Sequence, residues 1–363
     1  MIAGILGKGK IGKDPAKKPE AKKNNNHHIF SKEEAEKRKK KEELWEQKKY
    51  VVQAHVIDIK TGRNVIVLNE SEAMANDIYS NYRVDLKTAG GGESVCIVDL
   101  SMEMVKKGEA GIFGDVAEKL GIEEGDIIQI AKMERPASVE YIKKKLDGES
   151  LDDGQIHTII TDLMGNRLSE GELTAWITST YIRGMSEDEI VSLTHSIVDS
   201  GNQLDLGVKP IADKHCIGGV AGNRTTMVLV PILAAAGIYI PKTSSRAITS
   251  ASGTADTMEV LAPVDFSVEE MKRIVLKTHG AVAWGGGMNL ASADDKLIKI
   301  RNPLSLDPRG MLLASILAKK KSVGAQYVVV DLPLGRGVKV AKLRAHAKPD
   351  SANTTSIIRR VGI

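Results

Sequence analysis

The chain has 363 residues, a formal net charge of +4 and only two cysteines, so it can hold two or three domains but is not a disulfide-stapled small protein. Residues 1–50 carry a net charge of +7 and the remainder carries −3, so the body lacks the basic surface of a nucleic-acid-binding domain. Without an apolar run near the ~18 residues of a membrane span, we expect a soluble, cytoplasmic protein with no membrane partner and no nucleic-acid partner beyond what the basic leader binds.

Residues 1–49 are rich in lysine and include the low-complexity stretch KKNNNHH. Ser31 and Glu34 have the spacing of a capping box, which would open a charged helix. Charged runs of this kind are most often solvated, so we expect a disordered or helical extension. The two adjacent histidines have no second pair at metal-ligand spacing, and we expect no metal there.

Residues 50–134 have the pattern of a β-rich domain. Short apolar stretches at Val51–Ile59 and Asn64–Leu68 flank a Thr-Gly turn, and further strands are expected at Ser94–Leu100 and Asp126–Ile130. The region contains no nucleophile beside a base and no glycine loop with a cation. We therefore expect it to serve packing or oligomer contacts.

Residues 135–205 have the pattern of a small helical domain. Ser169 with Glu172, and Ser186 with Glu189, form capping boxes before apolar stretches that repeat at helical spacing. The predicted helices are Leu173–Ile182 and Ile190–Val198.

From residue 206 onward strands and helices alternate. The predicted strands are Val208–Ala212, Ile238–Pro241, Ala281–Trp284 and Tyr327–Asp331, with helices at Thr225–Ala236 and Val268–Thr278 between them. This order implies a parallel or mixed sheet with helices on both faces, and ligands then bind at the carboxyl ends of the strands. The predicted fold class is therefore α/β, with a β-rich module and a small helical domain before the larger α/β domain.

Two loops rich in glycine and hydroxyl groups lie at these strand ends, Lys214–Gly219 and Thr243–Thr254. Glycines let backbone N–H groups approach a ligand, helix N-termini favour anions, and Lys214 and Arg246 add positive charge. Ordinary βα turns also contain Gly, Ser and Thr. Two such loops roughly 30 residues apart, each with its own cation, favour a double phosphate-binding site.

Five segments carry a family resemblance: KHCIGGVAGN, KTSSRAITSASGTADTMEV, WGGGMNLASADD, LSLDPRG and LPLGRGVKV. In order and spacing they resemble the thymidine phosphorylase superfamily, and most closely its archaeal-type AMP phosphorylase branch, over about residues 50–340. The resemblance implies a glycosyltransferase without cofactor or metal. Such an enzyme uses inorganic phosphate to cleave a nucleoside 5′-monophosphate (AMP, with CMP and UMP as further candidates) into ribose 1,5-bisphosphate and free base.

The resemblance also implies site residues. Asp307 precedes Pro308 and would by itself suit a helix cap, but the resemblance makes it the proton donor to the leaving base. The implied substrate contacts are Gly219, Ser245, Arg246, Ala247, Ile248, Thr249, Ser250, Thr254, Ser315 and Lys339. Related nucleoside phosphorylases suggest further phosphate or base contacts at Lys214, His215, Cys216, Arg301 and Lys319.

The chain departs from the family pattern in two places. Cys216 stands where the family usually has serine and is a weaker hydrogen-bond donor. Residues 341–363 diverge, so we expect a C-terminally truncated α/β domain at 206–340, with about 300–322 joining the helical domain. Members of the family look at least dimeric, which predicts a homo-oligomer.

Three alternatives stay open. A thymidine or pyrimidine nucleoside phosphorylase is disfavoured by the N-terminal module and by the SSRAITSA loop. A phosphoribosyltransferase would differ by requiring diphosphate chemistry and magnesium. A chain that lacks part of the α/β domain could also be an inactive fragment that still binds nucleotides.

Overall fold

The structure, a computed structural model, describes residues 49–216, 224–246, 252–331, 357 and 359–363. Several predictions lie outside these residues. They concern the N-terminal extension, the segment 341–356, and the contacts at Gly219, Ala247, Ile248, Thr249, Ser250 and Lys339.

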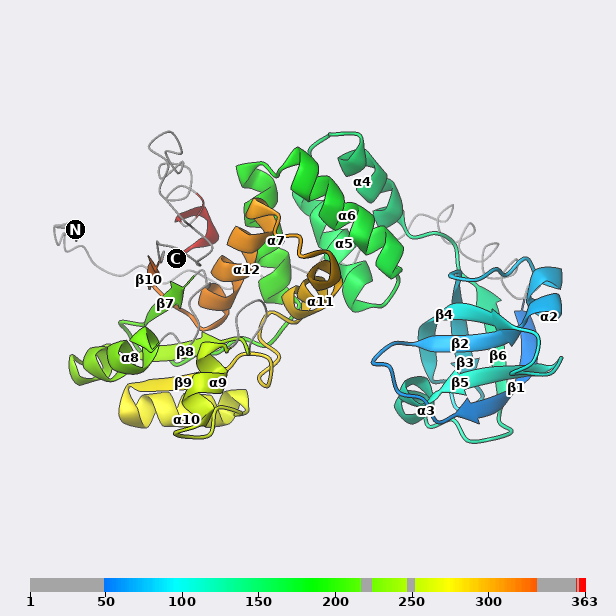
Figure 1. Cartoon of the computed structure of the whole chain (residues 1–363), viewed down its shortest axis with the longest axis horizontal. Helices are drawn as coiled ribbons and strands as arrows, with labels where there is room; N and C mark the ends of the chain where they lie inside the picture. The colour runs from blue at the N-terminus through cyan, green and yellow to red at the C-terminus, as the bar shows by residue number, and fades with distance from the viewer. Residues whose placement is uncertain (1–48, 217–223, 247–251, 332–356, 358) are drawn as a thin grey trace, which may run out of the picture. The chain divides into compact units, whose positions relative to one another are not determined.

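The N-terminal part is a closed barrel of six strands, which confirms the β-rich prediction (Figure 1). The strands are β1 (Lys49–Ile57), β2 (Val65–Asn69), β3 (Arg83–Thr88), β4 (Glu93–Ser101), β5 (Glu109–Phe113) and β6 (Ile127–Lys132), in the order β1-β5-β2-β4-β3-β6. Two short helices, α2 (Glu70–Ala75) and α3 (Gly114–Leu120), accompany them. Alternate side chains such as Ile66, Leu86, Val98 and Ile130 fill the interior and are fully buried.

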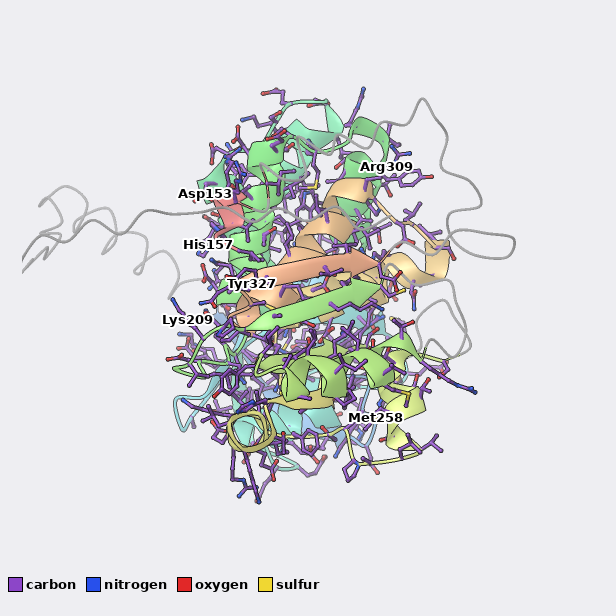
Figure 2. The ribbon with its side chains drawn as sticks, turned by 90° about the vertical axis from the view of Figure 1, so that its left-hand side faces the viewer. Asp153, His157, Lys209, Met258, Arg309 and Tyr327 are labelled. Carbon is purple, nitrogen blue, oxygen red and sulfur yellow. The ribbon has the colours of Figure 1, made fainter. Side chains whose placement is uncertain are left out.

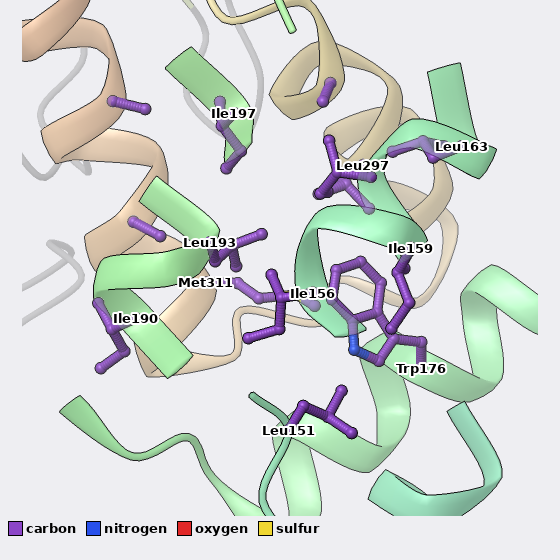
Figure 3. Packing of buried hydrophobic residues seen from close by; sticks show 14 of the residues in the cluster. Leu151, Ile156, Ile159, Leu163, Trp176, Ile190, Leu193, Ile197, Leu297 and Met311 are labelled. Carbon is purple, nitrogen blue, oxygen red and sulfur yellow. The ribbon is translucent and has the colours of Figure 1, made fainter. Parts of the chain in front are cut away.

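A helical bundle follows, and its members come from two stretches of the chain. Helices α4 (Ala137–Leu146), α5 (Asp153–Met164), α6 (Glu170–Arg183) and α7 (Glu187–Asp199) share one core with α11 (Ser292–Arg301) and α12 (Arg309–Ser322). A short 3₁₀ turn, η1 (Asn302–Leu304), lies between α11 and α12. Trp176 is fully buried among Ile156, Ile159 and Leu193, with Met311 of α12 nearby (Figure 3).

Capping boxes begin three helices, two of them at the predicted residues Ser169 and Ser186. The side chains of Ser169, Ser186 and Ser267 each accept a hydrogen bond from the backbone N–H three residues on, and the glutamate there accepts one from the serine N–H. Each box satisfies backbone donors that would otherwise lack a partner. The capping serines Ser169 and Ser186 were therefore predicted correctly, although α6 and α7 begin at Glu170 and Glu187, before the predicted starts at Leu173 and Ile190.

The third part contains four parallel strands, which confirms the α/β prediction. Strand β10 (Tyr327–Asp331) pairs with β7 (Ala212–Cys216), and β8 (Ile240–Ser244) pairs with β9 (Gly280–Trp284). A bridge between Ile211 and Tyr239 joins the two pairs, with Ala212 N–H donating to the Tyr239 carbonyl at 2.9 Å. Helices α8 (Thr225–Ala235), α9 (Thr254–Glu259) and α10 (Val268–Thr278) complete this part.

The predicted boundaries of β7 and β8 were wrong. Strand β7 begins at Ala212, where the predicted strand ended, so Lys214, His215 and Cys216 lie in the strand rather than in a loop. Likewise, Thr243 and Ser244 end β8 instead of opening the second loop. Polar residues normally indicate a loop, but Asp331 on β10 pairs with Lys214 and lets this buried lysine occupy strand β7.

Candidate active site

Strands β7 and β8, together with helix α12, bring together a cluster of buried lysines. Lys214 on β7 is 4% exposed, Lys242 on β8 is 5% exposed, and Lys320 on α12 is 1% exposed. Figure 2 looks onto β7 and β10, which lie side by side, and labels Tyr327 at the start of β10 and Arg309 at the start of α12. Buried ammonium groups are costly unless they are paired, so their partners define the site.

Two of the three lysines have a carboxylate partner. Lys320 Nζ lies 2.7 Å from Asp213 Oδ2, and both side chains are almost completely buried. Lys214 Nζ lies 2.8 Å from Asp331 Oδ2 on β10, a charge contact that is not aligned as a hydrogen bond. These pairs tie β7 to α12 on one side and to β10 on the other.

Lys242 is the third lysine, and it has a different environment. Its Nζ donates to the backbone carbonyl of Thr243, and it has no carboxylate within ion-pair distance in the described part of the chain. The Lys242 pKa is lowered to about 7, chiefly by burial and then by the positive charges of Lys320 and Lys214, against the opposing effect of Asp213. Near neutral pH this side chain is therefore close to its titration midpoint.

His215 lies among the same cations. Its pKa is held well below the ordinary value, chiefly because protein surrounds the ring and then because Lys320, Lys242, Lys319 and Lys214 are close. The imidazole is therefore neutral at physiological pH. A neutral ring can donate from one nitrogen and accept at the other, which suits contact with a base or a sugar hydroxyl.

Two predicted contacts on α12, Ser315 and Lys319, converge on a carboxylate that the sequence had not indicated. Ser315 Oγ donates to Asp294 Oδ2 at 2.7 Å, and Lys319 Nζ lies 2.6 Å from the same oxygen. Asp294 belongs to α11 and is 2% exposed. Arg301, at the end of α11, is also buried. The predicted residues Lys214, His215 and Lys319 thus share one neighbourhood.

In the structure the second loop begins at Ser245, directly after β8 ends, and a separate ion-pair cluster lies at its base. Arg246 contacts Glu259, with Nη2 2.9 Å from Oε1, and Asp256 at 3.3 Å. Its guanidinium also lies 4.8 Å from the centroid of a Trp284 ring. Arg246 is therefore held against α9 and β9, which fixes one end of the loop.

Gly253 and Thr254 form the other end of this loop. A Cβ at Gly253 would lie 2.5 Å from the Ser245 carbonyl oxygen and 2.7 Å from the Arg246 carbonyl carbon, so only glycine fits this close approach. Thr254 is the first residue of α9, where helix N–H groups point outward. The structure thus brings Ser245, Arg246 and Thr254 together.

Asp307, the predicted proton donor, lies at the opposite end of α12 from Lys319 and Lys320. It is exposed and comes two residues before the helix begins at Arg309, with Pro308 in the N-cap position. Cys216 is the last residue of β7 and is partly buried.

Sequence reasoning missed five charged residues of the cluster: Asp213, Lys242, Asp294, Lys320 and Asp331. One signal was available, because Lys242 follows Tyr239-Ile240-Pro241 and a lysine directly after an apolar run is a candidate for burial. Lys320 gave no such signal because it belongs to a run of three lysines at a helix end.

Other features of the described residues lie apart from this cluster. A surface cavity of about 280 Å³ is lined by polar residues including Asn202, Glu269 and Asn289 and contains none of the predicted site residues. Within the described ranges, no set of three or more His, Cys, Asp or Glu side chains is arranged to hold a metal ion. No described helix combines the length and hydrophobicity that crossing a membrane requires.

The bundle and the parallel strands have counterparts in a known family. Residues 139–201 match the helical bundle domain of the glycosyl transferase family, and residues 208–307 match its α/β domain. Over these residues the chain is similar to that family.

Relatives within the family carry a more specific name. The chain is 46% identical to AMP phosphorylase 1 of Archaeoglobus fulgidus over 293 residues, which cover 81% of this chain and 58% of that protein. It is 44% identical to AMP phosphorylase of Methanococcus maripaludis over 297 residues, or 82% of this chain and 59% of that one. The resemblance to AMP phosphorylases is thus confirmed over a chain that spans about three fifths of these relatives' length.

Among solved structures, anthranilate phosphoribosyltransferase (TrpD) from Thermus thermophilus superimposes with a TM-score of 0.49 at 19% sequence identity. The match covers 61% of this chain and 63% of the other. A similarity this weak adds nothing to the assignment.

Proposed function

We propose that this protein catalyses the phosphorolysis of nucleoside 5′-monophosphates. Inorganic phosphate would displace the base from AMP, and from CMP and UMP as further candidates, to give ribose 1,5-bisphosphate and free base. The observation that carries the proposal is the 46% identity to an AMP phosphorylase over four fifths of the chain. The cluster of buried cations on the parallel strands β7 and β8 supports it, because ligands of open α/β sheets bind beyond the carboxyl ends of such strands.

Each part of the site has a role in this proposal. Lys214 would attract the attacking phosphate to the anomeric carbon, and the loop between Ser245 and Thr254 would enclose the nucleotide. The neutral His215, with Ser315 and Lys319, would contact the base or the sugar. Asp307 would protonate the departing base, a contribution that typically accelerates such a step by about 10²–10⁴-fold.

The direct test is release of adenine from AMP in the presence and absence of inorganic phosphate. We expect phosphate-dependent release from AMP and none from adenosine. An Asp307→Asn variant should lose at least about 100-fold in kcat, whereas Asp58→Asn, at another exposed aspartate, should be unchanged. Release only from free nucleosides would favour the nucleoside phosphorylase alternative, and stabilisation by AMP without turnover would favour a nucleotide-binding fragment.

We further propose that the protein is a cytoplasmic homo-oligomer, at least a dimer. Tyr181 and Ile182 on α6 are 56% and 70% exposed, and apolar side chains exposed in this way are common at subunit contacts. Light scattering coupled to size-exclusion chromatography measures the mass directly. A monomer at micromolar concentration would contradict this proposal.

A further inference from the structure

The charges at the ends of β7 and β8 do not balance. Three ion pairs join Lys320 to Asp213, Lys214 to Asp331 and Lys319 to Asp294. Lys242 is a fourth lysine in this neighbourhood and has no carboxylate within ion-pair distance in the described chain. The cluster therefore holds one more buried cation than the carboxylates neutralise.

Two further buried polar groups nearby lack a hydrogen-bond acceptor among the described residues. They are Lys214 Nζ, which contacts Asp331 without hydrogen-bond alignment, and Thr243 Oγ1. Lys214 and Lys242 each follow the bridged residues Ile211 and Tyr239 by three positions, so the two lysines lie level on neighbouring parallel strands. Because side chains alternate along a strand, Lys214 and Lys242 share one face of the sheet, and Thr243 lies on the other face of β8.

Leaving a charged ammonium group buried and unpaired costs several kcal/mol, so such a group either loses its proton or binds an anion. The hydrogen bond from Lys242 to the Thr243 carbonyl offsets only part of this cost. A doubly charged oxyanion with several acceptor oxygens would neutralise the excess charge and accept from the unsatisfied donors.

We propose that Lys242 is an anion-binding residue that takes up a proton when a phosphate-like dianion binds at the ends of β7 and β8. The site follows from the arrangement of charges, and only the identity of the anion as phosphate rests on the proposed function. In the empty site Lys242 is partly neutral, and the bound anion restores its full positive charge.

Other charged groups surround Lys242 and also influence the anion. From the elements packed against it these are Asp213, Lys214 and His215 on β7, Lys319 and Lys320 on α12, Asp294 on α11, and Asp331 on β10. A Lys242→Met variant leaves all of them in place. The difference between the variant and the wild type therefore isolates Lys242.

Calorimetric titration with sodium sulfate tests the proposal, because sulfate stays a dianion from pH 6.0 to 8.5 and does not itself titrate. With a Lys242 pKa of about 7 in the empty site, affinity should fall roughly 30-fold across this range as the lysine loses its proton. At pH 7, buffers of different ionisation enthalpy should reveal uptake of about half a proton per anion bound.

The variants decide the outcome. Lys242→Met and Lys242→Gln should bind sulfate about 10- to 100-fold more weakly at pH 6.0 and lose most of the pH dependence, whereas Lys272→Met, at an exposed lysine on α10, should match the wild type. Absence of sulfate binding to the wild type, a flat pH profile, or unchanged affinity in both Lys242 variants would each overturn the proposal. These readouts need no turnover, so they stand apart from the test of the proposed function.

Two sources of the dianion are distinguished by direct binding at a fixed pH. If Lys242 contacts the attacking phosphate, Lys242→Met should weaken binding of inorganic phosphate and leave AMP unchanged. If it contacts the 5′-phosphoryl group, the variant should bind AMP more weakly and should no longer prefer AMP to adenosine. Unchanged binding of both ligands would again refute a role for Lys242.

Discussion

The buried ion pair between Lys145 on α4 and Glu189 on α7 supports a quantitative prediction. Lys145 Nζ lies 2.7 and 2.9 Å from the two Glu189 oxygens, and both side chains are at most 4% exposed. The same carboxylate accepts from the Leu151 N–H at 3.0 Å and from the Ser186 N–H at 2.8 Å, where it closes a capping box. Glu189 therefore joins α4, the α5 entrance and the start of α7.

Lys145→Met keeps the length of the side chain but leaves the Glu189 carboxylate buried with only the two backbone donors. Breaking one partner of a buried pair typically costs about 3–5 kcal/mol, a large share of the roughly 5–15 kcal/mol that a domain has. Lys143→Met on the same helix is the matched control. Lys143 pairs with Glu140 at the surface, with side chains 58% and 60% exposed, so the expected loss is about 0–0.5 kcal/mol.

Urea unfolding followed by tryptophan fluorescence measures both losses, because Trp176 is fully buried in this bundle. Replacing the other two tryptophans, Trp45 and Trp284, by phenylalanine leaves Trp176 as the only reporter. In a double-mutant cycle, Glu189→Gln should recover part of the Lys145→Met loss, since the amide removes the unpaired negative charge. If Lys145→Met costs no more than Lys143→Met, the ion pair does not stabilise the bundle and the reasoning fails.

Three further predictions concern single side chains. Gly253→Ala forces a methyl group against backbone atoms and should lower the free energy of unfolding, measured by thermal unfolding, by about 1–3 kcal/mol. Gly90→Ala, where the new methyl group would have no atom nearer than 3.9 Å, should change it by no more than about 0.5 kcal/mol. Equal effects of the two substitutions would contradict the close approach at Gly253. Burial raises the Cys96 pKa to about 12, so in a Cys216→Ser background we expect a thiol reagent at pH 8 to modify Cys96 only after unfolding, and rapid native reaction would be contrary evidence. Lys242 binds a proton below about pH 7 in the folded protein but up to about pH 10.4 in the unfolded chain. The free energy of unfolding of the wild type should therefore rise by about 2–3 kcal/mol relative to that of Lys242→Met between pH 7 and 9, as measured by urea titration. Parallel pH profiles for the two proteins would exclude this linkage.

The helices of the bundle could be predicted from the sequence because their signals are local. A capping box such as Ser186 with Glu189 spans three residues, and the apolar repeat that follows it belongs to the same segment. The barrel could be predicted only as a β-rich region. Its pairs β1–β5 and β2–β4 are parallel and join strands distant in the chain, so strand order does not follow from local patterns.

The candidate site also contains some residues that local sequence patterns indicate and others that they do not. Lys214 and Arg246 could be selected as candidates because each belongs to a segment of the sequence that contains glycines or hydroxyl residues. The Lys320–Asp213 pair joins residues 107 positions apart, and the sequence does not distinguish Lys320 from the adjacent lysines Lys319 and Lys321. Pairing across such a separation depends on how α12 packs against β7, which is a property of the tertiary structure.

Helix α12 connects the two kinds of residue that the proposed reaction requires. Its apolar side, including Met311, Ala314 and Leu317, belongs to the core of the bundle, while Lys320 reaches β7. From Arg309 to Lys320 the helix rises about 16 Å, so in the proposed reaction Asp307 and the lysine cluster would act on different parts of a ligand. Lysine side chains on a helix lean toward its N-terminus and shorten this gap to roughly 10 Å. A nucleotide lying along α12, with its base toward Asp307 and an anionic group toward the lysines, would satisfy both ends, whereas a free phosphate ion contacts only one.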